Sequence, residues 1–173
     1  MEAIVEFGKI ILPAGAVLYA MFLTTRMFLR KEYDLKLIEM KTKNTEITLP
    51  IRLQAYERIC LFLERIAPKN LVLRVNTPEM NALAFQQIMV KEVREEFGHN
   101  LSQQVYVSES AWEAVRNAME EVILIINDST TGMTEETPSV ELAKVIFEKI
   151  IEREHLAVDS ALSFVKKEIQ QIL

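Results

Sequence analysis

An uncharged apolar run near the N-terminus constrains this chain more than any other feature. The run is Ile10–Thr25 and reads IILPAGAVLYAMFLTT. Continued for one more turn, it forms a helix of about 20 residues and about 30 Å, which matches the hydrocarbon thickness of a bilayer. We therefore expect residues 10–29 to form a transmembrane helix that contacts the lipid bilayer, after a short extracytoplasmic N-terminus of residues 1–9.

Two other interpretations of this run compete with a membrane span. A cleaved signal peptide is disfavoured because Glu2 and Glu6 precede the run with only Lys9 as a positive charge, whereas a secretory n-region is basic. A buried helix of a soluble bundle remains open, because the charge-free stretch is short for a membrane span.

The charges on either side of the run predict the orientation. Residues 26–43 hold six basic and three acidic side chains, whereas residues 1–9 hold one basic side chain. The positive-inside rule then places the N-terminus outside and the rest of the chain in the cytoplasm, as a single-pass protein of the inner (cytoplasmic) membrane. We expect residues 30–46 to form a basic connector helix and residues 47–173 to form a cytoplasmic helical domain.

Composition excludes several kinds of partner and cofactor for this domain. Residues 44–173 hold 13 basic and 20 acidic side chains, so we expect no nucleic-acid partner. The single cysteine, Cys60, excludes an intramolecular disulfide and a multi-cysteine zinc site. Loops that bind phosphates need two or three nearby glycines, and the domain has only Gly98 and Gly132. We therefore expect no cofactor.

Apolar periodicity predicts an all-α fold, a compact bundle of about five amphipathic helices after the transmembrane helix. Prolines, capping residues and the polar stretch 128–139 mark the ends of these helices. The short apolar link 71–73 is interpreted either as a helical turn or as an extended piece. The predicted helices of the bundle are Pro50–Ala67, Thr77–Phe97, Ser110–Asn127, Val140–Glu154 and Leu156–Leu173.

Three capping signals define the helix ends in more detail. The sequence Thr77-Pro78-Glu79 is typical of an N-cap followed by a first-turn proline and acid. Gly98 is placed to adopt the left-handed conformation that ends a helix. Ser110 and Glu113 have the spacing of a capping box at the start of the next helix. Trp112 begins the apolar stripe of that helix, and we expect it to be mostly buried.

No pattern in the sequence indicates catalysis or metal binding. His99 and His155 lie beside predicted helix ends and belong to no HExxH or HxxxH pair, so we interpret them as surface or capping residues. Cys60 lies beside an apolar stripe and is interpreted as an inert thiol. We predict no catalytic residue and no enzymatic activity. The alternative is a helical enzyme in which distant carboxylates, such as Glu57, Glu92 or Glu120, approach His99 in three dimensions.

The link between the second and third helices of the bundle is the least ordinary local sequence. We interpret it as a packed connection in which Tyr106 and Val107 hold the next helix. The alternative is a groove that binds a partner. The residues that would carry partner binding are Leu101, Val105, Tyr106 and Trp112.

Two motifs carry a resemblance to a known family. They are NLSQQVYVSESAW at residues 100–112 and LPIRLQAYER at residues 49–58. Together with the N-terminal span, they resemble a family of uncharacterised single-span membrane proteins from Bacteroidetes. The resemblance implies a bacterial inner-membrane setting and assigns no activity and no site residue.

Taken together, these features predict a membrane-anchored cytoplasmic interaction or scaffold module. Helical domains without a catalytic cluster most often bind other molecules, although fold class alone does not establish function. The partner is expected to be a protein at the inner membrane, of unknown identity, and the oligomeric state is left open.

Overall fold

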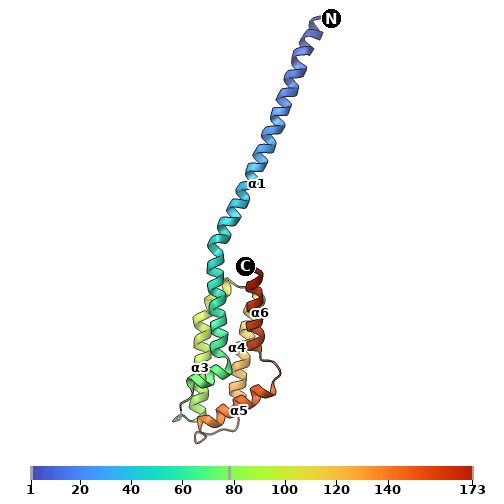
Figure 1. Cartoon of the computed structure of the whole chain (residues 1–173). Helices are drawn as coiled ribbons and strands as arrows, with labels where there is room; N and C mark the ends of the chain where they lie inside the picture. The colour runs from blue at the N-terminus through green and yellow to red at the C-terminus, as the bar shows by residue number, and fades with distance from the viewer. Residues whose placement is uncertain (1, 78, 173) are drawn as a thin grey trace. The chain divides into compact units, whose positions relative to one another are not determined.

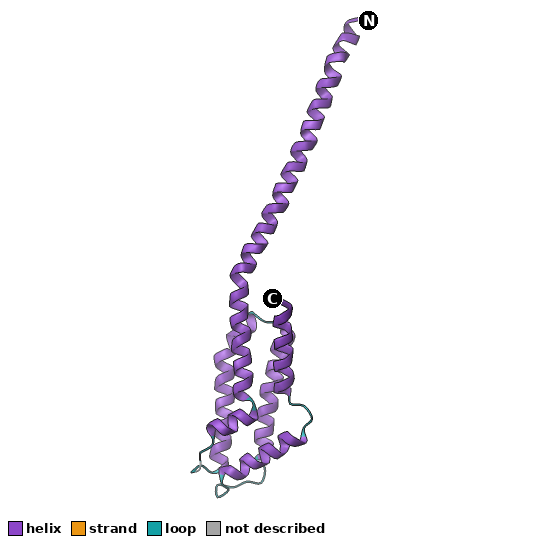
Figure 2. Cartoon of the chain, viewed as in Figure 1, coloured by secondary structure: helices purple, strands orange, loops and turns teal. Residues whose placement is uncertain are grey.

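The computed structural model describes residues 2–77 and 79–172, and these residues are helical apart from short loops (Figure 2). The predicted all-α fold is confirmed. Within the described residues there is no β-strand, only an isolated bridge between Asn81 and Pro138. The helices are α1 (Glu2–Ile66), α2 (Pro68–Val75), α3 (Ala82–Asn100), the 3-10 helix η1 (Leu101–Val105), α4 (Glu109–Ser129), α5 (Ser139–Glu152) and α6 (Ala157–Ile172).

The chain divides into two units, residues 1–49 and residues 50–173. Residues 2–49 of the first unit form a single stretch of α1. It contains a segment that is long and apolar enough to cross a membrane by length and composition, with a mean hydropathy of 1.4. Large apolar side chains along this segment are exposed, including Leu12 at 76% and Leu18 at 68%.

The sequence predicted that a new helix begins at Pro50. This prediction was wrong, because α1 continues through Pro50. A proline inside a helix removes one backbone hydrogen bond and leaves the carbonyl four residues earlier without its partner. That carbonyl belongs to Glu46, which is exposed, so water can satisfy it. Residues 44–49 also contain no glycine and no polar loop that would end the helix.

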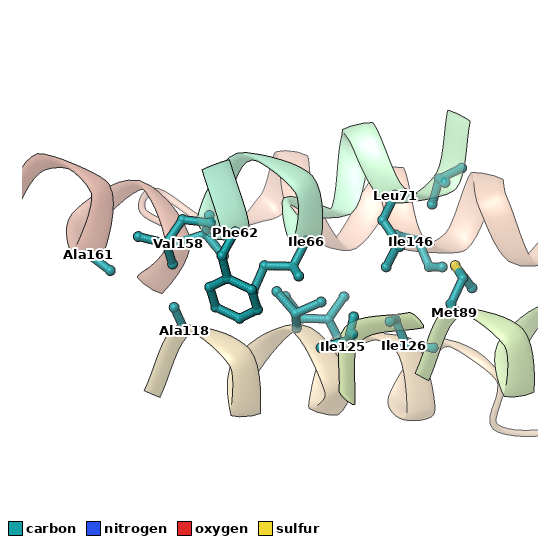
Figure 3. Close-up of a cluster of buried hydrophobic side chains, with 14 of the residues drawn as sticks. Phe62, Ile66, Leu71, Met89, Ala118, Ile125, Ile126, Ile146, Val158 and Ala161 are labelled. Atoms are coloured by element: carbon teal, nitrogen blue, oxygen red, sulfur yellow. The ribbon is translucent and has the colours of Figure 1, made fainter. Parts of the chain in front are cut away.

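The second unit is a helical bundle in which α6 runs beside α4, and α3 contacts α2, α4 and α5 (Figure 1). Five apolar residues recur at helical spacing in the predicted helix Pro50–Ala67, and only Ile51 among them is exposed. The buried four are Ala55, Ile59, Phe62 and Ile66. Phe62 and Ile66 point toward Ala118 and Ile125 of α4 (Figure 3). Burial of these apolar side chains is the main force that holds the bundle together.

The start of α3 was predicted wrongly. The helix begins at Ala82, and Asn81 is its N-cap, with its side chain accepting a hydrogen bond from the Ala84 N–H at 2.8 Å. Thr77 therefore does not cap a helix, and Pro78 lies outside the described residues. The reason is tertiary. The Ala82 N–H donates to the Thr137 carbonyl, and the Met80 carbonyl accepts from the Ser139 N–H, so the segment between α4 and α5 holds residues 80–82.

The end of α3 also differs from the prediction. Gly98 lies inside the helix and not in a left-handed cap, and the one described residue with positive φ is Gly132, at 83°. The helix continues to Asn100 and passes directly into η1. The Asn100 side chain is nearly buried and donates to the Glu96 carbonyl at 2.9 Å, which supplies a local hydrogen bond in place of a glycine cap.

The N-cap of α4 is Ser108, not Ser110, which lies inside the helix. Trp112 is partly buried and packs against the core, in line with the expectation that it is mostly buried. Its ring stacks on Phe97 with centroids 5.4 Å apart. The apolar link 71–73 is helical and belongs to α2. Helices α5 and α6 begin and end within two residues of their predicted bounds, except that Leu173 lies outside the described residues.

Candidate partner-binding surface

The link between α3 and α4 exposes three apolar side chains. Leu101 is 46%, Val105 is 76% and Tyr106 is 41% exposed, and we call these three residues the link surface. Val107, by contrast, is half-buried and packs against the core. Of the two residues expected to hold the next helix, Val107 packs against the core and Tyr106 is exposed.

A cluster of hydrogen bonds beneath the link connects three parts of the bundle. The carboxylate of Glu168 on α6 accepts hydrogen bonds from the Tyr56 hydroxyl of α1 and from the Ser108 hydroxyl at 2.6 Å. It also accepts from the Ser108 backbone N–H at 3.3 Å. We call Tyr56, Ser108 and Glu168 the clamp. Next to it, Arg52 Nε donates to the Tyr106 carbonyl at 3.1 Å and so holds the link from the α1 side.

The ionisation states of the clamp residues are matched to these hydrogen bonds. Burial raises the pKa of Glu168, but the hydrogen bonds from Ser108 and Tyr56 and the charge of Arg52 outweigh it, and the net pKa is lowered. The pKa of Tyr56 is raised by burial and by its hydrogen bond to Glu168. At neutral pH a carboxylate therefore faces a protonated phenol, and each group makes its best hydrogen bond.

Within the clamp, the Ser108 hydroxyl serves two contacts. It donates to Glu168 and accepts from the Ala111 N–H at 3.0 Å, which caps α4. Because the same hydroxyl joins the helix cap to α6, we interpret the cluster as a structural element that fixes the link.

A shallow pocket of about 450 Å³ lies beside the link surface. The side of the partly buried Trp112 ring forms part of its wall. Acidic and basic groups from the first two turns of α4 surround it. Its lining residues are Gln104, Val107, Glu109, Trp112, Glu113 and Arg116. Of the four residues that the sequence singled out for partner binding, three are exposed in the link and Trp112 lines the pocket.

The residues considered for chemistry lie elsewhere. His99 and His155 are exposed, and burial raises the pKa of the half-buried Cys60 thiol, which lowers its reactivity at neutral pH. Among the described residues, no group of three or more histidine, cysteine, aspartate or glutamate side chains is arranged to hold a metal ion.

None of the carboxylates considered for the enzyme alternative, Glu57, Glu92 and Glu120, lines the pocket at His99. The shallow pocket at His99 contains Glu96, which pairs with Arg65 at 2.8 Å. Glu92 is bonded to Arg74 at 2.5 Å instead, and this hydrogen bond lowers its pKa. Glu57 and Glu120 are exposed.

The clamp was not predicted from the sequence. One signal was available, because Glu168 follows Val165 by three positions and Ala161 by seven, so it continues the buried stripe of α6. A charged residue in line with a buried stripe needs a partner, and this pattern indicates a specific polar contact. The identity of that partner could not be read from the sequence, because Tyr56 lies 112 positions earlier.

A comparison with protein families finds one match, which covers residues 2–172 and is described as a family of unknown function, DUF7935. The chain belongs to this family. No curated protein and no solved structure matches the chain.

Proposed function

We propose that this chain is a single-span membrane protein whose helical body binds a protein partner at the membrane. Residues 10–29 cross the inner (cytoplasmic) membrane with the N-terminus outside, and residues 47–173 form the cytoplasmic domain. The observation that carries the binding role is the link surface, where three apolar side chains are exposed although their backbone is held in place.

The anchor is supported by the exposure of apolar side chains along α1. Val17 at 66% and Phe22 at 59% exposure join Leu12 and Leu18 in one continuous apolar segment. Soluble proteins rarely leave such a surface in water, whereas lipid would cover it at no cost. The basic residues that follow the segment support the orientation.

The binding role is supported by rigidity as well as by exposure. The clamp and Arg52 fix the backbone of residues 106–108 from two helices. A surface that is ordered before binding loses little conformational entropy when a partner arrives. Tyrosine is also one of the residue types enriched among those that contribute most to protein interfaces. The partner should therefore offer an apolar groove to Val105 and Tyr106.

The anchor and its orientation can be tested together. In membranes from cells expressing the full chain, alkaline carbonate should leave the protein in the pellet. A Glu46→Cys probe in a Cys60→Ala background should react with an impermeant maleimide in inverted vesicles and not in intact spheroplasts. Release by carbonate would exclude a spanning helix, and reaction in spheroplasts would reverse the orientation.

The link surface is tested by capturing the tagged full chain from native membranes. We expect Val105→Asp and Tyr106→Asp to lose a protein that the unmodified chain retains. The matched control is Ile151→Asp, because Ile151 is also an apolar side chain, 82% exposed, but lies on α5. Equal melting temperatures would show that the variants are folded. If the link variants retain the same protein as the control, the link surface is not the binding site.

A further inference from the structure

The part of α1 that follows the proposed anchor carries an apolar stripe with a seven-residue period. Tyr33, Leu37, Met40 and Ile47 recur at spacings of four, three and seven, and Asn44 occupies the remaining position of the pattern. The four apolar side chains are exposed, at 64%, 40%, 63% and 66%. Leu37 and Asn44 take the a positions of a heptad, and the other three take the d positions.

Other positions of the heptad repeat as well. Glu32, Glu39 and Glu46 occupy successive c positions, which face solvent in a two-stranded coiled coil. The ion pair between Glu39 and Lys43 at 2.9 Å lies along the helix surface and leaves the stripe uncovered. The same a/d spacing in the sequence extends to Ile51.

We propose that residues 33–47 form a parallel two-stranded coiled coil with the same segment of a second copy of this chain. Asn44 is the residue that identifies the occupant. A single asparagine at an a position is satisfied by the same asparagine of a parallel partner in register, and it selects two strands at some loss of stability. The proposal rests on the proposed anchor, because insertion into one membrane with one orientation makes the two helices parallel.

The charges predict that this association is modest and depends on salt. Lys36 occupies a g position and Lys41 an e position. In a parallel dimer Lys36 of one copy therefore faces Lys41 of the other, and these like charges repel. The segment is also shorter than the three to four heptads typical of stable coiled coils. Dimers should therefore form in the membrane, where the anchor raises the local concentration, and should be strengthened by salt.

A second face of the same segment also carries apolar residues and could form the dimer contact instead. Leu35, Ile38 and Leu49 share a face with Thr42 and Thr45, whose hydroxyls bond to backbone carbonyls of their own helix. This face has fewer apolar residues at its a and d positions and no asparagine. Cross-linking can tell the two faces apart, because each predicts a different set of reactive positions.

The experiment uses the full chain in inverted membrane vesicles, with Cys60→Ala and one new cysteine at a time. A short bismaleimide should link two copies through Leu37→Cys, Met40→Cys and Ile47→Cys. The matched controls Glu39→Cys, Thr42→Cys and Glu46→Cys should give several-fold less dimer. Cross-linking that peaks at Ile38→Cys and Thr42→Cys would overturn the proposal, and so would a product with the mass of one chain plus another protein.

A disruption experiment completes the test. Leu37→Glu combined with Ile47→Glu should abolish the Met40→Cys dimer, whereas Thr42→Glu should leave it unchanged. Carbonate extraction of the same vesicles separates the two proposals. If the chain stays in the membrane and no position forms a dimer, the coiled coil is wrong and the anchor stands. If carbonate releases the chain, the anchor itself is wrong.

Discussion

Removing the Glu168 carboxylate tests whether the clamp holds the link. Glu168→Ala leaves the hydroxyl of Tyr56, a residue only 2% exposed, without its acceptor. A buried hydroxyl without a partner costs about 1–3 kcal/mol, and the Ser108 hydrogen bonds to the carboxylate are lost as well. Because Ser108 can turn to water, we expect a total loss of about 2–4 kcal/mol in the free energy of unfolding.

The matched variants divide this loss into its parts. Glu168→Gln keeps an acceptor for Tyr56 and should cost about 1 kcal/mol. Tyr56→Phe removes the donor and leaves the carboxylate with Ser108 and Arg52, which should also cost about 1 kcal/mol. In the double variant Tyr56→Phe, Glu168→Ala the losses should be less than additive by about 1–2 kcal/mol, because both changes remove the same bond.

The assay is urea unfolding of the full chain in mild detergent, followed by the fluorescence of Trp112, the only tryptophan. Trp112 lies in α4, the helix that Ser108 caps. A loss below about 0.5 kcal/mol for Glu168→Ala, or additive losses in the double variant, would refute the reasoning, because contacts within one network couple by at least this amount.

The clamp also makes stability depend on pH. The pKa of Glu168 in the folded chain is lowered from its ordinary value of 4.5. Its contribution is therefore complete above pH 4.5 and is lost as the pH falls through the lower, folded pKa. Glu168→Gln should remove this part of the acid sensitivity. A stability curve below pH 5 that is identical for both chains would contradict the assigned ionisation.

Three other predictions follow from the bundle. Trp112→Ala should cost about 2 kcal/mol, less than the roughly 3–5 kcal/mol of a fully buried ring, and a loss below about 1 kcal/mol in urea unfolding followed by circular dichroism would mean that the stacking on Phe97 is weak. Residues 44–173 should fold without the anchor and give a helical circular dichroism spectrum, whereas a substantial strand signal would contradict the fold. The triple variant Cys60→Ala, His99→Gln, His155→Gln should complement a deletion strain, and failure at normal abundance and melting temperature would favour the enzyme alternative.

The helices could be predicted from the sequence wherever a long apolar stripe defines them. Helices α5 and α6 were placed to within two residues because their stripes contact one continuous core. The helix starts were less predictable. Asn81 caps α3 where the neighbouring Ala82 N–H bonds to the Thr137 carbonyl, and Ser108 caps α4 where its hydroxyl bonds to Glu168. Neither of these contacts is local in sequence. The helix start predicted at Pro50 was wrong for a local reason. An exposed helix tolerates the backbone hydrogen bond that a proline removes, so the helix does not end there.

The candidate site shows the same division. The sequence identified Leu101, Val105 and Tyr106 because apolar side chains in a polar link are locally unusual. The sequence did not show that hydrogen bonds from Arg52 and Glu168 hold the backbone of the link. Arg52 and Tyr106 are 54 positions apart, and Ser108 and Glu168 are 60 positions apart. Such contacts depend on how the helices are arranged, and helical periodicity alone does not determine that arrangement.

The long separation of Tyr56 and Glu168 in sequence has a consequence for synthesis. Glu168 lies 112 positions after Tyr56, so the clamp cannot close until α6 has left the ribosome. A nascent chain that already contains Leu101, Val105 and Tyr106 therefore exposes them on a link that Glu168 does not yet hold. The link would present the ordered surface proposed for binding only after α6 has emerged. Closing so long a loop late in folding also means that losing the clamp should mainly speed unfolding and hardly slow folding.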